Sequence, residues 1–165
     1  MRVLVLTGPP AVGKTTIGRL LAAARPRCAL VDVDDVRHMV VSGHSAPWDG
    51  DDGRTQQALG VLNGCALANN FTGQGIDVVI VDVLTEDTAA RYRQLLPDPL
   101  VVQLTVSYPE ALRRAHTRPV HLSWDEFRQL HDQHARLTAV DVRVDTTGLG
   151  PGHTAARLSE LWAAS

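Results

Sequence analysis

The sequence predicts an α/β protein with a five-stranded parallel sheet and helices on both faces. Short apolar runs with strand character alternate with helix-compatible segments along the chain, and this order builds a parallel sheet with crossover helices. The run from Gly8 to Thr15 joins the first apolar run to the first helical segment. With 165 residues, 44% of them hydrophobic, residues 1–165 are expected to form one domain around a single core.

The first strand is expected over Val3 to Leu6, and a glycine-rich loop follows it. The loop fits the pattern G-x-x-x-x-G-K-[ST] at every fixed position. Its glycines let successive backbone N–H groups curl around a phosphate, and the N-terminus of the following helix adds partial positive charge. The residues predicted to bind nucleotide phosphates are Gly8, Pro9, Pro10, Ala11, Val12, Gly13, Lys14, Thr15 and Thr16.

Lys14 is the only lysine in the chain, and fifteen arginines carry the remaining basic charge. A planar guanidinium would crowd a phosphate loop, so the compact ammonium indicates a specific role. We expect Lys14 to reach the β- and γ-phosphates and Thr15 to offer its hydroxyl to Mg²⁺. The predicted cofactors are therefore ATP and Mg²⁺.

A second buried strand is expected over Cys28 to Val33, followed by a short helix through about Val41. Asp32, Asp34 and Asp35 fall at its carboxyl end, where open α/β sheets bind ligands. An aspartate there also caps a helix well. Because capping needs one aspartate, three within four residues indicate a further role.

The polar, glycine-rich stretch from Ser42 to Asp52 is expected to be a loop near an acceptor pocket. Its Trp48 either stacks on a substrate ring or anchors the loop on the core. A helix is expected from Thr55 to Phe71, ended by Gly73 and Gly75.

The run from Ile76 to Leu84 is apolar on both faces, which suits a central parallel strand. Asp82 lies near its end. In phosphate-loop proteins an acidic residue on a neighbouring strand holds Mg²⁺ directly or through water. Asp82 is therefore a metal candidate, and its alternative role is to cap the helix that begins at Glu86.

A fourth strand is expected over Leu100 to Val106, and Pro109 opens the next helix. Arg113, Arg114 and Arg118 follow within six residues. They form either a solvated face or a set of phosphate contacts, and we favour phosphate contacts. A capping box at Ser123–Glu126 is expected to start a helix through about Leu137. A strand is expected over Ala139–Val144, a turn over Asp145–Leu149 and a closing helix over Thr154–Trp162.

Charge and composition exclude several classes. The net charge of −2 and the lack of a dense basic run argue against tight, non-specific duplex binding. No apolar run approaches the ~20 residues of a membrane span, and the first strand starts without a signal peptide, so we expect a cytoplasmic protein. Cys28 and Cys65 are expected to be reduced thiols. His131 and His134 are expected on a solvated helix face rather than in a metal site. A GTPase is disfavoured because no Asn-Lys-x-Asp motif is present.

These residues together resemble the small P-loop kinases, a group that includes chloramphenicol phosphotransferase, shikimate and gluconate kinases and the kinase domain of phage polynucleotide kinase. The resemblance spans nearly the whole chain and implies a three-layer P-loop NTPase fold like that of nucleoside monophosphate kinases. The features that carry it are Gly8–Thr15, Asp34-Asp35-Val36-Arg37, the strand ending in Asp82, the pair Arg114 and Arg118, and the turn Asp145–Leu149.

The resemblance implies roles for single residues. In such kinases the first Asp of Asp-Asp-x-Arg is the base toward the acceptor hydroxyl and the Arg helps hold the acceptor, which by position are Asp34 and Arg37. Shikimate-like kinases use an Asp-x-Asp pair, here Asp32 near the metal and Asp34 on the substrate. Whether Asp32, Asp34 or Asp35 is the base stays open.

Small-molecule kinases also carry a mobile lid with arginines, which the resemblance places around 113–124. It implies that Arg114 and Arg118 stabilise charge on the transferred phosphoryl group. In related kinases the turn before the last helix lies near the adenine, so Thr147 to Leu149 are expected to line the base pocket.

The function implied is an ATP- and Mg²⁺-dependent kinase that phosphorylates a hydroxyl on a small molecule, such as an antibiotic or a nucleoside-like metabolite. Two alternatives stay open. One is an ATP-binding regulator or resistance protein without phosphoryl transfer. The other is a polynucleotide 5′-hydroxyl kinase, although the slight negative charge offers no track for a nucleic acid strand. The acceptor, the preference for ATP or GTP and the oligomeric state also stay open.

Overall fold

The computed structural model describes residues 1–117 and 122–165. In the described residues, five parallel strands form one sheet, as the sequence predicts, and their order is β2-β3-β1-β4-β5. The strands are β1 (Val3–Thr7), β2 (Cys28–Asp32), β3 (Asp77–Val81), β4 (Leu100–Thr105) and β5 (Val142–Asp145). The helices are α1 (Lys14–Ala23), α2 (Val33–Arg37), α3 (Gly50–Gly73), α4 (Glu86–Leu95), α5 (Tyr108–Ala115), α6 (Trp124–Arg136) and α7 (Pro151–Ala164).

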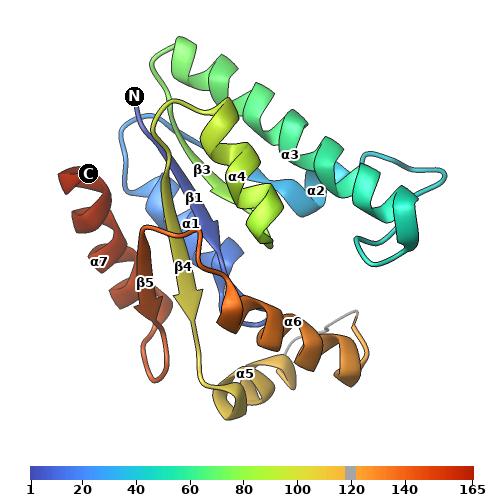
Figure 1. Ribbon diagram of the computed structural model, residues 1–165. Coiled ribbons are helices and arrows are strands. Elements are labelled where there is room, and N and C mark those ends of the chain that lie inside the picture. The colour runs from blue at the N-terminus through green and yellow to red at the C-terminus, as the bar shows by residue number, and fades with distance from the viewer. Residues whose placement is uncertain (118–121) are drawn as a thin grey trace.

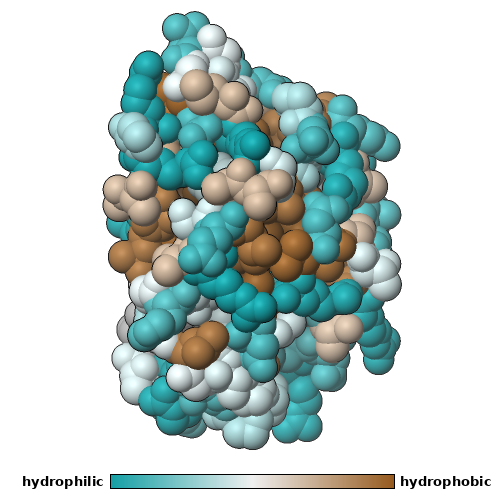
Figure 2. Space-filling model, turned by 90° about the vertical axis from the view of Figure 1, so that its left-hand side faces the viewer, coloured by the Kyte–Doolittle hydropathy of each residue, from teal (hydrophilic) through white to brown (hydrophobic). Residues whose placement is uncertain are grey.

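Two cores lie on opposite faces of the sheet. Along β1 the side chains alternate, so that Val3 and Val5 enter one core and Leu4 and Leu6 the other. Helices α3 and α4 cover the first core, and α1 and α7, with the fully buried Trp162, cover the second (Figure 1). On the side where α7 lies, hydrophobic side chains form a band between hydrophilic ones (Figure 2), since several apolar residues packed on the second core stay partly exposed. The three-layer prediction is confirmed.

The carboxyl ends of β1, β2 and β3 meet at one edge of the sheet. Leu6 pairs with Val81, and Val81 pairs with Asp32, so the chain leaves the three strands side by side. The hydroxyl of Thr7 accepts the backbone N–H of Leu84 over 3.0 Å, which fixes the turn after β3 against the end of β1. Polar side chains that follow these strands therefore gather at the same edge.

Local hydrogen bonds explain why several predicted boundaries are wrong. Strand β2 ends at Asp32, because the Asp32 side chain accepts the backbone N–H of Asp34 and starts α2 at once. Helix α2 then ends at Arg37 rather than near Val41. In the same way, Thr85 caps α4 by accepting a hydrogen bond from the N–H of Thr88, and Asp82 instead accepts the N–H of Val83 in the turn before that helix.

Helix α3 begins at Gly50, inside the stretch predicted to be a loop. The side chain of Asp49 accepts the N–H of Ala46 over 2.8 Å, and the N–H of Asp49 donates to the Ala46 carbonyl over 2.9 Å. This turn sets the chain against the first turn of α3, where a Cβ at Gly53 would lie 2.0 Å from the Ala46 oxygen. Close packing thus requires glycine at position 53, although glycine lowers helix propensity. The capping box at Ser123 and Glu126 is confirmed.

The two helical histidines differ from their prediction. His134 is 3% exposed rather than solvated, and neither ring nitrogen has a partner among the described residues. Burial lowers the pKa of His134 to about 3, so its ring is neutral. His131 is half-buried, with its Nε2 3.1 Å from the Pro10 carbonyl oxygen. Both cysteines are free thiols in the structure, as expected.

Within residues 1–117 and 122–165, no helix is long and apolar enough to cross a membrane.

Candidate functional site

The glycine-rich loop, residues 8–15, connects β1 to α1 and is shaped by two glycines. Gly8 has φ +152°, and a Cβ there would lie 2.5 Å from the backbone oxygen of Leu104. Gly13 precedes α1 with φ +100°, and no side chain caps the helix. The N-terminus of α1, which carries partial positive charge, thus begins directly after the loop. The loop is thus a ready cradle for an anion.

The ammonium group of Lys14 lies over this loop. Its Nζ donates to the carbonyl oxygens of Gly8, over 2.8 Å, and of Pro9, over 3.2 Å. Burial lowers the pKa of Lys14, and carboxylates at Asp34 and Asp82 act against that shift. The loop therefore holds a positive charge at its centre while the helix N-terminus stays accessible.

Thr15 and Asp32 join the loop to strand β2. The Thr15 hydroxyl donates to Oδ2 of Asp32 over 3.0 Å, and Oδ1 of Asp32 accepts the N–H of Asp34. Burial raises the pKa of Asp32, and the hydrogen bond from Thr15 offsets part of that effect. A hydroxyl and a carboxylate oxygen, both hard ligands, thus lie together beside Lys14.

The three clustered aspartates have different surroundings. Asp34 has a side chain 54% exposed, is ion-paired with Arg37 and lines a cavity that also contains Lys14. Asp35 is exposed, does not line that cavity, and has no hydrogen bond or ion pair with another described residue. The Asp32 carboxylate already accepts hydrogen bonds from the Thr15 hydroxyl and from the N–H of Asp34 at the start of α2. Of the three, Asp34 has the carboxylate that a ligand in the cavity can reach.

Arg37 lies between two carboxylates. Its guanidinium pairs with Asp34 on the outer side, and its Nη1 lies 3.4 Å from Oδ1 of Asp82 on the inner side. Asp82 is 2% exposed. Its carboxylate also accepts hydrogen bonds from the Tyr92 hydroxyl over 2.9 Å and from the N–H of Val83 over 2.8 Å. Burial raises the pKa of Asp82 to about 6, against the effect of Arg37. Asp82 lies behind Arg37 and does not line the cavity.

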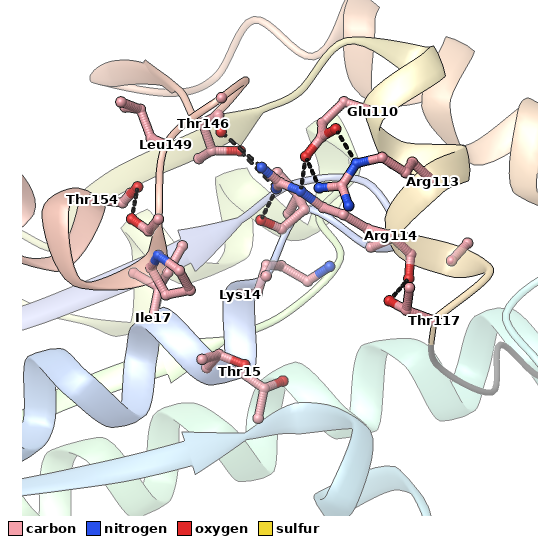
Figure 3. A pocket seen from close by; sticks show the side chains of 18 of the residues that line it. Lys14, Thr15, Ile17, Glu110, Arg113, Arg114, Thr117, Thr146, Leu149 and Thr154 are labelled. Carbon is pink, nitrogen blue, oxygen red and sulfur yellow. Dashed lines mark hydrogen bonds and ion pairs between the residues drawn. The ribbon is translucent and has the colours of Figure 1, made fainter.

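The cavity has a volume of about 650 Å³, which is in the range of small-molecule sites. The glycine-rich loop forms its floor, and helix α5 and the turn before α7 form its walls (Figure 3). Thr16 lines it beside Thr15, and Val12 lines it from the loop. Gly148 and Leu149, from the turn expected to approach a base, also line it.

Arg114 joins these walls. It donates to Oε1 of Glu110 over 2.8 Å, to the Thr146 carbonyl over 2.8 Å and to the Val12 carbonyl over 3.3 Å (Figure 3). Arg113 pairs with the same Glu110, and hydrogen bonds from both arginines lower the pKa of Glu110 to about 2. Arg114 therefore fixes α5, the glycine-rich loop and the turn before α7 relative to one another.

Glu110 and Thr146 are site residues that the sequence analysis missed. The spacing of Glu110 and Arg114, four residues apart on one helix, was a usable signal for an ion pair. Nothing local marks Thr146, because its contact with Arg114 joins residues far apart in the sequence. Arg118 lies outside the described residues. Trp48 is 49% exposed.

The residues present fit a nucleotide with a divalent cation. The cradle left by Gly8 and Gly13 suits a phosphate, and Lys14 and Arg114 supply positive charge on opposite sides of it. No cluster of three or more His, Cys, Asp or Glu in the described part of the chain could hold a metal alone. Thr15 and Asp32 offer instead the small donor set with which Mg²⁺ binds beside phosphates.

Solved structures share this fold at low sequence identity. A sugar kinase from Janibacter sp. superposes with a TM-score of 0.74 at 14% identity, covering 99% of this chain and 95% of that one. A tunicamycin resistance protein from Deinococcus radiodurans has a TM-score of 0.69 at 12% identity, with 98% and 95% covered. Shikimate kinase from Acinetobacter baumannii, solved with shikimate, has a TM-score of 0.67 at 19% identity, with 99% and 94% covered. At these identities the likeness concerns the fold.

The search of curated proteins gave no match. A family model described as "AAA domain" matches residues 4–131, which contain the glycine-rich loop, Asp32 to Arg37 and Arg114. This match covers most of the chain and agrees with the sheet order and the loop geometry. The chain therefore belongs to this AAA domain family and has the α/β fold of the small P-loop kinases.

Proposed function

We propose that this protein is a kinase that transfers the γ-phosphate of Mg-ATP to a hydroxyl group of a small molecule. One observation carries the proposal: Asp34 lies on the same cavity as Lys14, Thr15 and Arg114. A carboxylate that can accept a proton thus lies beside the groups that hold phosphates. Such an arrangement suits transfer to an acceptor rather than nucleotide binding alone.

The phosphate side of the cavity contains the glycine-rich loop, Lys14 and Thr15. The N–H groups of the glycine-rich loop would bind the β-phosphate, and Lys14 would exchange its contacts with the Gly8 and Pro9 carbonyls for β- and γ-phosphate oxygens. Thr15 and Asp32 would hold Mg²⁺, which when bound neutralises phosphate charge. Arg114 would face the transferred group from α5.

The acceptor side is assigned to Asp34. As the acceptor oxygen forms its bond to the γ-phosphorus, its proton passes to the Asp34 carboxylate, and the bond from phosphorus to the β-γ bridging oxygen breaks to release ADP. Arg37 would orient Asp34 through their ion pair. A lid around 113–124, with Arg118, would exclude water from the site.

The test is ADP release with Mg-ATP against a panel of hydroxylated antibiotics, sugars and nucleosides, and a 5′-hydroxyl oligonucleotide. Antibiotics belong in the panel because a tunicamycin resistance protein shares the fold. Asp34→Asn should lose at least about a hundredfold in turnover and keep its affinity for ATP.

Asp35→Asn is the matched comparison, because it changes the next aspartate on the same helix. If Asp35→Asn loses turnover and Asp34→Asn keeps it, Asp35 is the base and the assignment is wrong. Ligand-dependent ATP binding with no phosphorylated product from any acceptor would show a binding protein instead of a kinase.

A further inference from the structure

The two sides of the proposed site differ in charge. On the phosphate side, Lys14, Arg113 and Arg114 line the cavity. Asp34 lines the same cavity and belongs to residues 33–54, which run from α2 to the first turns of α3 and contain five aspartates and two arginines. This segment bears an excess of negative charge next to the proposed base, Asp34.

Both arginines of that segment already have carboxylate partners. Arg54 pairs with Asp51 on the exposed first turn of α3. Arg37 pairs with Asp34 and Asp82. Within residues 33–54, all of which the structure describes, both arginines are thus paired with carboxylates, and the segment contains no lysine.

Packing holds Arg37 in place. Its side chain is 8% exposed, and its stem lies on helix α3, where a Cβ added at Gly60 would be 2.8 Å from Arg37 Cγ. Turning the guanidinium toward a ligand would leave Asp82, 2% exposed, without its cation. Leaving a buried carboxylate unpaired in this way is costly. Arg37 therefore acts as a positioning residue for Asp34 rather than as an anion receptor.

We propose that the acceptor of this kinase carries no carboxylate or phosphate group and is an uncharged or amine-bearing hydroxyl compound. The inference rests on the proposed function and names the substrate class of that site. An anionic acceptor would lose its hydration beside Asp34 without gaining a cation from residues 33–54. An amine-bearing alcohol would meet a carboxylate of opposite charge. A 5′-hydroxyl oligonucleotide, which is a polyanion, does not fit.

The experiment separates acceptors by charge before the acceptor is known. A small-molecule extract of bacterial cells, supplemented with hydroxylated antibiotics, is divided by ion exchange into amine-bearing, uncharged and anionic fractions. Each fraction is incubated with the full chain, Mg²⁺ and ATP labelled at the γ-phosphate. Label transferred to a new compound is measured separately from released phosphate. Matched triads of a sugar, its amino sugar and its sugar acid are assayed alongside.

Transfer is expected in the amine-bearing or uncharged fraction, at least about tenfold above the anionic fraction. Asp34→Asn serves as the control and should transfer label in none of them. Transfer mainly to the anionic fraction, lost in Asp34→Asn, would overturn the inference and leave the kinase function standing. No transfer from any fraction or triad by a protein that binds ATP would remove the proposed function, and the inference with it.

Discussion

The Thr15 hydroxyl donates a hydrogen bond to Oδ2 of Asp32 over 3.0 Å, while Oδ1 of the same carboxylate caps helix α2 through the N–H of Asp34. One side chain thus connects the glycine-rich loop to the helix that carries the proposed base. The position of Asp34 relative to Lys14 therefore depends on Asp32.

Asp32→Ala removes both contacts. We expect the free energy of unfolding to fall by about 1 kcal/mol, because an N-cap is lost, and the Mg²⁺ concentration for half-maximal ATP binding to rise. Urea unfolding and a Mg²⁺ titration measure the two effects. Asp35→Ala, on the same helix without a partner among the described residues, is the control. Equal Mg²⁺ titrations for both variants would contradict the metal assignment.

Arg114→Ala removes the bridge between α5, the Val12 carbonyl and Thr146. We expect the affinity for ATP to fall about tenfold, since hydrogen bonds to charged groups are worth roughly 1.5–3 kcal/mol. Titration with a fluorescent ATP analogue measures this. Arg93→Ala, which breaks an ion pair with Asp141 outside the cavity, is the control and should bind as the wild type does. An unchanged affinity in Arg114→Ala would remove Arg114 from the nucleotide site.

Gly60→Ala tests the packing that holds Arg37. The new methyl group would lie 2.8 Å from Arg37 Cγ and 3.2 Å from Val33 Cγ1, so we expect a loss of about 1 to 3 kcal/mol of stability. Gly73→Ala, at the end of the same helix, would meet no described atom within 4 Å and should be neutral or slightly stabilising. Urea unfolding of the two variants gives the comparison. If Gly60→Ala unfolds like the wild type, α3 does not hold the Arg37 stem.

The buried carboxyl of Asp82 predicts a pH dependence of stability. Burial raises its pKa in the folded protein to about 6, above the ordinary value of 3.8, despite the opposing Arg37 and the Tyr92 hydroxyl. The folded state then binds the proton more tightly than the unfolded chain, so this contribution to stability is complete below about pH 3.8 and is lost as pH rises through about 6.

Asp82→Asn should remove that dependence. We expect the stability of the wild type, relative to Asp82→Asn, to be lower at pH 7.5 than at pH 5 by about 1.4 kcal/mol, because about one pKa unit of the raised range lies above pH 5 and one unit corresponds to about 1.4 kcal/mol. Urea unfolding at the two pH values measures the difference. Tyr92→Phe, which keeps the carboxyl, should retain the pH dependence. A relative stability that rises with pH would show that Arg37 holds Asp82 ionised.

The sequence by itself determined the sheet and the glycine-rich loop. Strands and helices differ in the spacing of their apolar residues, so their alternation can be recognised along the chain. The loop from Gly8 to Thr15 is a local motif whose residues are adjacent in the chain. The capping box was also predictable from the sequence, because its two residues, Ser123 and Glu126, lie within four positions of the chain. Each of these features depends on chemistry between near neighbours.

Only the tertiary structure decided which polar groups meet. It placed Asp82 behind Arg37 and Tyr92, joined Arg114 to Thr146, and buried His134, whose sequence pattern indicates a solvated helix. It also started α3 at Gly50 and packed Gly53, in the first turns of that helix, against the backbone of Ala46. These outcomes depend on contacts between distant segments, and the free energy of those contacts appears in no local pattern.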